Sequence, residues 1–284
     1  MKKSLFIVLA FALLNSGCST VGLVYRNADW YLQHKINGYT SFTAQQKETI
    51  HLEVLDYMRW HRKNALPEYI IFLQNLNGAA QYKGQLSVET TAQLRVQLMD
   101  LYKKTMLPAI QPGALLLSSL DKEQIQELDR SLAEDIQQQI KDKLNGTLDE
   151  NLDTRADKTV DFLEWLAGNL SKDQEKRVRE MSRRLPFISP FYIQNREENQ
   201  RRLIALLNSH ASADEIAAYM TTRTLTPEAT RTPSQQQAFD SFEAGADEMV
   251  IQIHSLLTDQ QKEHINEKVS GYIEDMRGFS REVP

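Results

Sequence analysis

Four short segments of this chain begin with the same helix-starting signal. In each, a Thr, Ser or Asp follows an apolar residue and precedes a Gln by three positions; the pairs are Thr43 and Gln46, Asp121 and Gln124, Ser171 and Gln174, and Thr258 and Gln261. This spacing is typical of a capping box, in which each side chain accepts a hydrogen bond from the backbone N–H of the other residue. Because each cap stabilises a helix by roughly 1 kcal/mol, the sequence predicts four sharply defined helix starts.

The first and last of these segments are alike beyond the cap. FTAQQKETI (42–50) corresponds to LTDQQKEHI (257–265), and apolar residues follow at steps of four, seven and eight from Ile50 and from Ile265. These steps place the side chains on one face of an α-helix. Either an old duplication of a helical hairpin or convergence on a well-capped amphipathic helix explains the likeness.

The remaining sequence also favours helices. Apolar residues in 148–170 alternate at steps of three and four, which predicts a seam facing the core. Ser234 and Gln237 are expected to cap a further helix that runs to about Leu257, and the prolines are expected to kink or end helices. No alternating Val/Ile/Thr-rich run is present, so strands are not expected. We therefore expect an all-α fold, an elongated multi-helix bundle of capped helical hairpins with pseudo-repeats.

The N-terminus has the features of a signal peptide. Lys2 and Lys3 precede an apolar run from Leu5 to Leu14, which is too short to span a bilayer comfortably. Small residues follow directly before Cys18, and because this is the only cysteine, no internal disulfide can form. We expect residues 1–17 to be a cleaved signal peptide and residues 18–284 to form an all-helical periplasmic domain.

The position of Cys18 resembles the lipobox of bacterial lipoproteins, in which the cysteine takes a diacylglycerol and becomes the mature N-terminus. The match departs from the usual pattern at Asn15, where Leu is commonest, and the alternative is an ordinary signal peptide with a chance cysteine. Acyl chains such as palmitate, at about 0.8 kcal/mol per buried CH₂, would hold the protein on a membrane. Ser19 after the cysteine looks like an outer-membrane address in a Gram-negative cell. The resemblance thus implies a lipid-anchored outer-membrane protein that faces the periplasm.

Charge and motifs limit the classes of function. Removal of residues 1–17 deletes two lysines, so the formal net charge of −5 becomes −7. A mildly acidic chain is not typical of nucleic-acid binders, and no such partner is expected. The histidines show no His-Glu-x-x-His or comparable spacing, and no phosphate loop or nucleophile elbow is present. We therefore expect no metal, cofactor or catalytic residue; a helical enzyme with a dispersed site is the alternative.

The N-terminal third resembles a Gram-negative bacterial lipoprotein family of unknown function (domain of unknown function 6279 type). The residues that carry this likeness are Tyr25, Asn27, Asp29 and Trp30, the Thr-x-x-Gln helix start, Trp60-His61-Arg62, Leu66-Pro67 and Tyr69. The resemblance implies a location and a helical fold but no mechanism. Leu257-Thr258 with Gln261 is also similar to the Leu-Thr-x-x-Gln motif of periplasmic stress chaperones, which implies a chaperone-like or envelope-stress role as an alternative.

A basic–aromatic corner, residues 176–202, is the leading candidate for a partner contact. On a helix over KRVREMSRRL (176–185), the apolar side chains point inward and the basic ones outward. The expected contact residues are Arg177, Arg179, Arg183, Arg184, Phe187, Phe191, Tyr192 and Arg196. They would bind an acidic envelope protein, lipid phosphates or lipopolysaccharide. The alternative is a solvated helix face balanced by nearby glutamates, with the aromatic side chains packed in the corner.

Trp60, His61 and Arg62 are the candidates for a pocket. His61 is either a general base or ligand contact, or a packed and hydrogen-bonded histidine at a helix end, and we favour the packed histidine. Four aspartates recur every fourth residue; they are Asp149, Asp153, Asp157 and Asp161. A divalent cation could bridge them, but the nearby basic residues Arg155 and Lys158 favour a solvated acidic face.

The segment after Cys18 contains three large aromatic residues, Trp30, Tyr31 and Tyr39. Either they lie at the membrane interface or they dock into the helical body, and we expect docking because a disordered tether would not need them. Together the sequence features predict a non-catalytic binding or scaffold module of the cell envelope.

Overall fold

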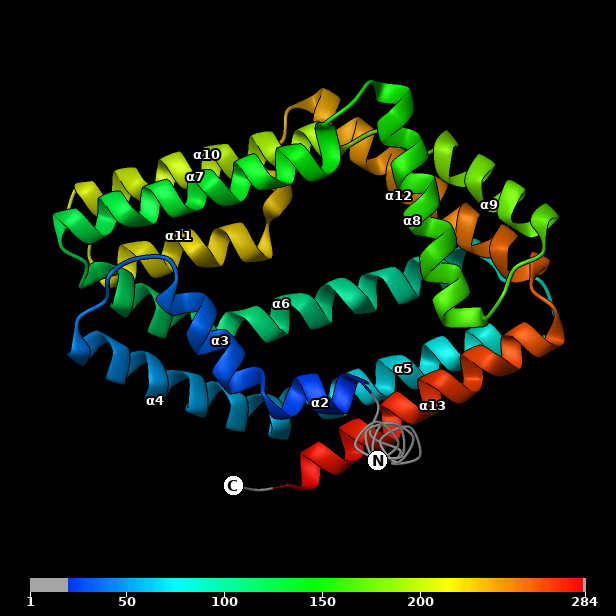
Figure 1. The fold of residues 1–284 in the computed structure, drawn as a ribbon, viewed down its shortest axis with the longest axis horizontal. Coiled ribbons are helices and arrows are strands. Elements are labelled where there is room, and N and C mark those ends of the chain that lie inside the picture. The colour runs from blue at the N-terminus through cyan, green and yellow to red at the C-terminus, as the bar shows by residue number, and fades with distance from the viewer. Residues whose placement is uncertain (1–19, 283–284) are drawn as a thin grey trace, which may run out of the picture.

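The computed structural model describes residues 20–282, which are helical almost throughout (Figure 1). Two short helices, α2 (Thr20–Arg26) and α3 (Ala28–Asn37), come first. The longer helices are α4 (Ala44–Trp60), α5 (Leu66–Gln81), α6 (Val88–Ser118), α7 (Lys122–Leu144), α8 (Leu148–Ala167), α9 (Lys172–Arg184), α10 (Ser189–Asn208), α11 (Ala213–Leu225), α12 (Pro233–Leu256) and α13 (Asp259–Arg281). A π-helical turn, η1 (His61–Ala65), and a 3₁₀ turn, η2 (Pro227–Thr230), complete the chain. No strand occurs in residues 20–282, and the prediction of an all-α multi-helix bundle is confirmed.

The four predicted capping boxes are all present. They begin α4, α7, α9 and α13, and both hydrogen bonds of each box are formed. Further boxes begin α8, α11 and α12. The predicted cap at Ser234 is wrong, because Thr232 caps α12 with Gln235 and the helix begins at Pro233. Proline is favourable at a first helical position, where its missing N–H is not needed.

The four predicted helix starts meet in two pairs, which the capping glutamines join. Gln46 and Gln124 exchange amide hydrogen bonds with N···O distances of 3.2 and 2.7 Å. Gln174 and Gln261 do the same at 2.8 and 3.2 Å. We refer to these as the first cap pair (α4 and α7) and the second cap pair (α9 and α13). The pseudo-repeat seen in the sequence is therefore also a repeat of tertiary contacts.

Each capping glutamine also donates to the backbone of its partner segment. The acceptors are the carbonyl oxygens two residues before the partner's N-cap, namely those of Ser119, Ser41, Leu256 and Asn169. A glutamine can accept from its own cap and donate to a neighbouring chain at once, whereas an ionised glutamate can only accept. This explains why Gln occupies the third helical position in the paired boxes, while Glu150 and Glu215 serve in boxes that form no such pair.

The apolar stripes predicted from the sequence are buried. On α4 they contribute Ile50, Val54 and Met58 to one cluster; on α13, Ile265, Val269 and Ile273 join side chains of α8 and α9 in another. A third cluster unites α6, α7, α10 and α11. On α8 the predicted seam is only partly buried, since Leu148 in the first turn is exposed.

Six helices contact one another in a closed ring, and one of them, α6, also contacts helices outside this ring. Helix α5 packs against α13, α13 against α8, α8 against α9, α9 against α12, α12 against α6, and α6 against α5. The 31 residues of α6 also reach α4 and α11, a length of about 46 Å at 1.5 Å per residue. Arg95 on α6 fixes α12 by binding the buried carboxylate of Asp247, with Nη2···Oδ2 at 3.0 Å. Helix α6 thus connects two halves of the fold: the first contains the first cap pair (α4 and α7) and the second contains the second cap pair (α9 and α13).

The predicted signal peptide, residues 1–17, and the predicted lipidation position, Cys18, lie outside the described residues. Within residues 20–282, no helix combines the length and the apolar character needed to cross a membrane.

Candidate functional site

An apolar groove lies between α3, α4 and α6, beginning one turn beyond the first cap pair, and has a volume of about 430 Å³. Its walls include Ile36 from α3, Val54 and Trp60 from α4, and Ala109 and Leu116 from α6. Of the residues that line it, only Glu53 and Asp56 on α4 are charged. The groove is therefore suited to apolar groups, with negative charge on one wall.

The sequence of α6 explains why space remains here. Pro108 and Pro112 lie inside the helix without ending it, and neither has a backbone N–H to donate to the preceding turn. On the same face Ala109 has only a methyl group and Gly113 has no side chain. A proline-containing wall of small residues cannot fill the volume opposite α4.

His61 directly follows Trp60, the last residue of α4 that lines the groove, and it begins the π-helical turn η1. Pro67 follows six residues later, and it cannot donate to the carbonyl one turn earlier, which favours the wider turn. The His61 Nδ1 atom lies 2.9 Å from the Tyr25 hydroxyl. The rings of Tyr57 and Tyr69 flank the imidazole, with centroid distances of 5.9 and 5.7 Å. His61 is thus enclosed by three phenols.

The surroundings of His61 keep it neutral. Burial, with the neighbouring Arg62 cation, lowers the pKa of His61 to about 4. Burial also raises the pKa of Tyr25 and Tyr57 to about 12. At neutral pH these groups form an uncharged, hydrogen-bonded cluster, as in the packed-histidine interpretation. Of the three candidate pocket residues, Trp60 lines the groove, whereas His61 and Arg62 contact Tyr25.

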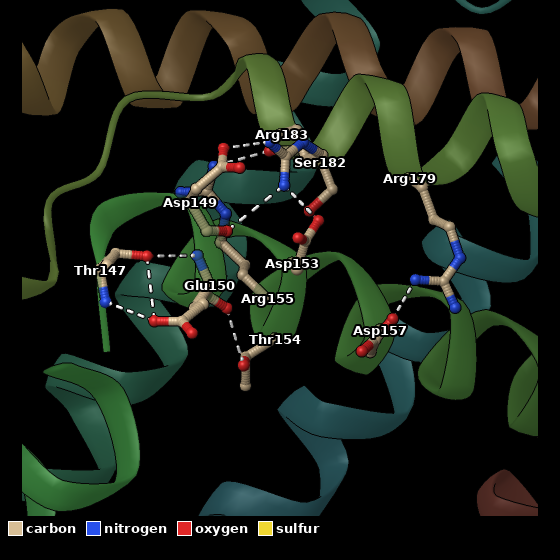
Figure 2. Close-up of polar contacts among 10 residues, drawn as sticks. All are labelled: Thr147, Asp149, Glu150, Asp153, Thr154, Arg155, Asp157, Arg179, Ser182 and Arg183. Carbon is tan, nitrogen blue, oxygen red and sulfur yellow. Dashed lines mark hydrogen bonds and ion pairs between the residues drawn. The ribbon is translucent and has the colours of Figure 1, made fainter. Parts of the chain in front are cut away.

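Figure 2 shows where the acidic stripe of α8 meets the basic face of α9. Arg179 pairs with Asp157, and Arg183 pairs with both Asp149 and Asp153. The hydrogen bonds that Arg179 and Arg183 donate to these carboxylates raise the pKa values of both arginines. Two of the predicted contact residues therefore already have partners of opposite charge, and the carboxylates bind arginines. No group of His, Cys, Asp and Glu side chains able to hold a metal ion occurs in the described part of the chain.

Arg155 has a structural task that the sequence did not indicate. Its guanidinium donates to the carbonyl oxygens of Ser182, Leu185 and Pro186 at 2.6, 2.7 and 2.9 Å. Ser182 lies in the last turn of α9 and Leu185 and Pro186 directly follow the helix, a region where carbonyl oxygens lack intrahelical donors. Arg155 thereby stabilises the helix end, and its partial burial lowers its pKa.

The other predicted contact residues of the basic–aromatic corner face different neighbours. Arg177 and Arg184 are exposed on α9, and Phe187 is half-buried. Phe191 and Tyr192 pack against Phe239 of α12, with ring centroids 6.5 and 5.0 Å apart. Arg196 faces α7, where the side-chain oxygen of Gln139 accepts from its guanidinium. The eight residues are thus distributed over contacts with α7, α8 and α12 as well as solvent.

The aromatic residues after Cys18 do not behave alike. Tyr39 docks on the body, where its hydroxyl donates to Asp135 at 2.8 Å. Trp30 and Tyr31 are 64% and 52% exposed, so the prediction that they dock is wrong. Both residues lie on α3, which reaches the body through other side chains such as Leu32 and Ile36.

The fold and the groove define an all-α protein in which four helix starts are joined in two pairs. A family model described as a family of unknown function (DUF6279) matches residues 38–231, which is more than half of the chain. The chain belongs to this family, as the N-terminal motifs indicated. The match includes the first cap pair but ends before α12 and α13. Neither the curated proteins nor the solved structures include a match to this chain.

Proposed function

We propose that this protein is a non-catalytic binding module of the cell envelope, anchored by a lipid on Cys18 to the periplasmic face of the outer membrane. The observation that carries the proposal is the apolar groove between α3, α4 and α6. Its volume of about 430 Å³ falls within the range of about 300–1,000 Å³ typical of ligand sites. Its lining, aromatic and aliphatic with two carboxylates, suits binding and offers no nucleophile with an adjacent base.

The N-terminal helices support a location close to a membrane. Helix α2, which begins two residues after Cys18, packs against α13, and its Tyr25 ring lies 4.7 Å from that of Phe279. Val24, Trp30 and Tyr31 on α2 and α3 remain exposed. Exposed aromatic side chains of this kind are enriched at membrane interfaces. A lipid on Cys18 would thus hold the body, and the groove beside α3, near the bilayer.

A chaperone-like role is the second candidate. Leu98 and Tyr102 are exposed and precede Met106 on α6 at steps of four, so they extend the groove face along the helix. Extended apolar surface next to negative charge is what a binder of unfolded chains would present. The Leu-Thr-x-x-Gln likeness adds little to this candidate, because Gln261 is bonded within the second cap pair.

The binding part of the proposal is tested by filling the groove. Ala109→Phe places a ring in it, while Leu115→Phe adds a ring at an exposed position of the same helix outside the groove. The probe is N-phenyl-1-naphthylamine, a neutral apolar fluorophore, and the signal is energy transfer from Trp60 after Trp30→Phe and Trp165→Phe. We expect Ala109→Phe to weaken probe binding at least tenfold and Leu115→Phe to leave it unchanged. Equal binding by both variants would contradict a binding role for the groove.

The location is tested separately by cell fractionation. Cys18→Ala should move the protein from the outer-membrane fraction to the soluble periplasmic fraction. Retention of Cys18→Ala in the membrane fraction would show that the lipid is not the anchor.

A further inference from the structure

The dimensions of the groove point to a particular kind of occupant. The α4 wall runs from Thr49 to Trp60 and the α6 wall from Met106 to Leu116, which is about 15–16 Å along each helix. This length corresponds to about three helical turns. Partner helices that lie in such grooves insert apolar side chains at positions i, i+3 or i+4, and i+7. Two walls that are each about three turns long therefore match one face of an added helix.

The volume shows how deeply such a helix would enter. A helix 16 Å long and about 10 Å wide occupies roughly 1,300 Å³, more than the 1140 Å³ of empty space in the groove even when its part open to solvent is included. A whole helix cannot be enclosed, but a row of its side chains can. The occupant would lie over the opening with one apolar face inserted and its remaining surface outside, so it must be amphipathic.

The charges on the walls determine which charge the occupant should carry. Glu53 lies on the same face of α4 as Thr49 and Trp60, and no ion pair to Glu53 is present in residues 20–282. Asp56, at the edge, pairs with the exposed Arg59. On α6, Lys104 is held by Glu68 of α5 at 2.6 Å. A lysine or arginine on the occupant would be attracted to this wall, whereas the head group of a fatty acid or anionic phospholipid would be repelled.

The exposed part of α6 extends the contact. Leu98 and Tyr102 continue the face of Met106, Ala109 and Leu116, and from Leu98 to Leu116 the helix is about 27 Å long. This length corresponds to a partner helix of about 18 residues. On the basis of the proposed binding role, we infer that the groove and this extension bind an amphipathic helix of another polypeptide, with basic residues beside its apolar face.

The inference is tested with four probes and the full-length lipidated protein in phosphatidylcholine nanodiscs, with empty nanodiscs as the reference. The first three probes are 18-residue peptides: Leu and Lys patterned to give one apolar helical face, Leu and Glu in the same pattern, and the Leu/Lys composition in scrambled order. The fourth is palmitate. After Trp30→Phe and Trp165→Phe, quenching of Trp60 fluorescence reports binding at the groove. We expect the patterned Leu/Lys peptide to bind at least tenfold more tightly than the other two peptides.

Matched variants separate the apolar and the electrostatic contributions. Ala109→Phe should abolish peptide binding, while Leu115→Phe should leave it unchanged. The double variant Glu53→Gln/Asp56→Asn should reduce the preference for Leu/Lys over Leu/Glu to less than about threefold and weaken its dependence on salt. Glu48→Gln, which removes a carboxylate of α4 that does not line the groove, should retain the full preference.

The outcomes distinguish this inference from the proposed function. Tighter binding of palmitate than of any peptide, with loss in Ala109→Phe, would overturn the helix inference and leave the binding role in place. Peptide binding that ignores charge and pattern would also overturn the inference. No binding of any probe, together with no effect of Ala109→Phe in the naphthylamine experiment, would overturn both.

Discussion

The first and second cap pairs join helices by the same hydrogen bonds, yet their surroundings differ. Next to the second pair, α13 is covered along one side by α5, which has 16 residues, and also contacts α8. Next to the first pair, α4 is covered by α3, which has only ten residues, and by α6 with its prolines. Equivalent apolar stripes are buried in both, but Ile50 and Val54 of α4 also line the groove. The repeated part is the framework, and the candidate binding surface arises where the covering helices differ.

The largest expected effect compares two equivalent isoleucines. Ile265 and Ile50 are 5% and 3% exposed, but only Ile50 borders the groove. We expect Ile265→Ala to lower the free energy of unfolding by about 4 kcal/mol and Ile50→Ala by about 2 kcal/mol, because an enclosed cavity costs more than one that opens to a groove. Urea unfolding of both variants measures the difference. Equal losses would mean that the two halves enclose their cores equally well.

The pH effect of His61 has no counterpart next to the second cap pair, because Met276 of α13 occupies the position equivalent to His61. The folded protein holds the pKa of His61 at about 4, against about 6.5 in an unfolded chain. Between these values the unfolded chain binds the proton more readily, so the stability from His61 is complete above pH 6.5. It is lost as the pH falls towards 4, with a total of up to about 3 kcal/mol.

His61→Phe should remove this contribution. We therefore expect the stability difference between wild type and His61→Phe to shrink from pH 7 to pH 4.5, measured by urea unfolding at both values. The comparison cancels the titration of carboxylates and of His254, whose pKa is also lowered by burial. Parallel pH profiles for the two proteins would contradict the prediction.

Substitution of the capping glutamines compares the pairs directly. In Gln174→Glu, a buried carboxylate would face the Leu256 carbonyl oxygen. The native Gln174 amide donates a hydrogen bond of 2.8 Å to this oxygen. We expect a loss of about 2 kcal/mol, because a donor is removed and an acceptor is left unsatisfied. Gln46→Glu should cost about 1 kcal/mol, since Gln46 is only half-buried. Thermal unfolding measures both, and a larger loss at Gln46 would reverse the order of the two pairs.

The smallest effect is expected outside both pairs, at the ion pairs of Figure 2. Arg183→Ala removes contacts with the exposed Asp149 and Asp153, and exposed ion pairs contribute little to stability. We expect the thermal midpoint to change less than for Gln46→Glu, and less still in high salt. A larger change would show that these pairs hold α8 and α9 together.

The sequence was sufficient for features set by nearby residues. The four capping boxes of the two cap pairs and the buried stripes of α4, α9 and α13 depend on spacings of three to eight residues, and these were predicted. The boxes of α8 and α11, in which Glu takes the place of Gln, follow the same spacing and were not predicted. The cap of α12 was misplaced because Ser234 with Gln237 and Thr232 with Gln235 satisfy the same spacing rule. Only the preference for proline at the first helical position favours Thr232.

Features that join distant segments were not predicted. Gln46 meets Gln124, and Gln174 meets Gln261, across 78 and 87 residues, and each glutamine already had a sufficient local explanation as a cap. Likewise the aspartates of α8 and the arginines of α9 were interpreted separately, although their reversed order suits neighbouring antiparallel helices. The groove depends on the short α3 and on the packing of α6, although Pro108, Pro112 and Gly113 were a signal of poor packing on that helix.

The contact between α5 and α13 also governs how the chain reaches its native state. Asn77 donates to Asn266 at 2.6 Å across 189 residues, and Gln81 donates to the Lys262 carbonyl at 2.5 Å across 181. All-α proteins usually fold fast because their contacts are local, whereas this contact closes a long loop at an entropic cost. During synthesis α13 emerges after all the other described helices. The side of α5 that α13 covers must therefore remain uncovered while α6 to α12 are made, which delays burial of this side and exposes it to aggregation in the meantime.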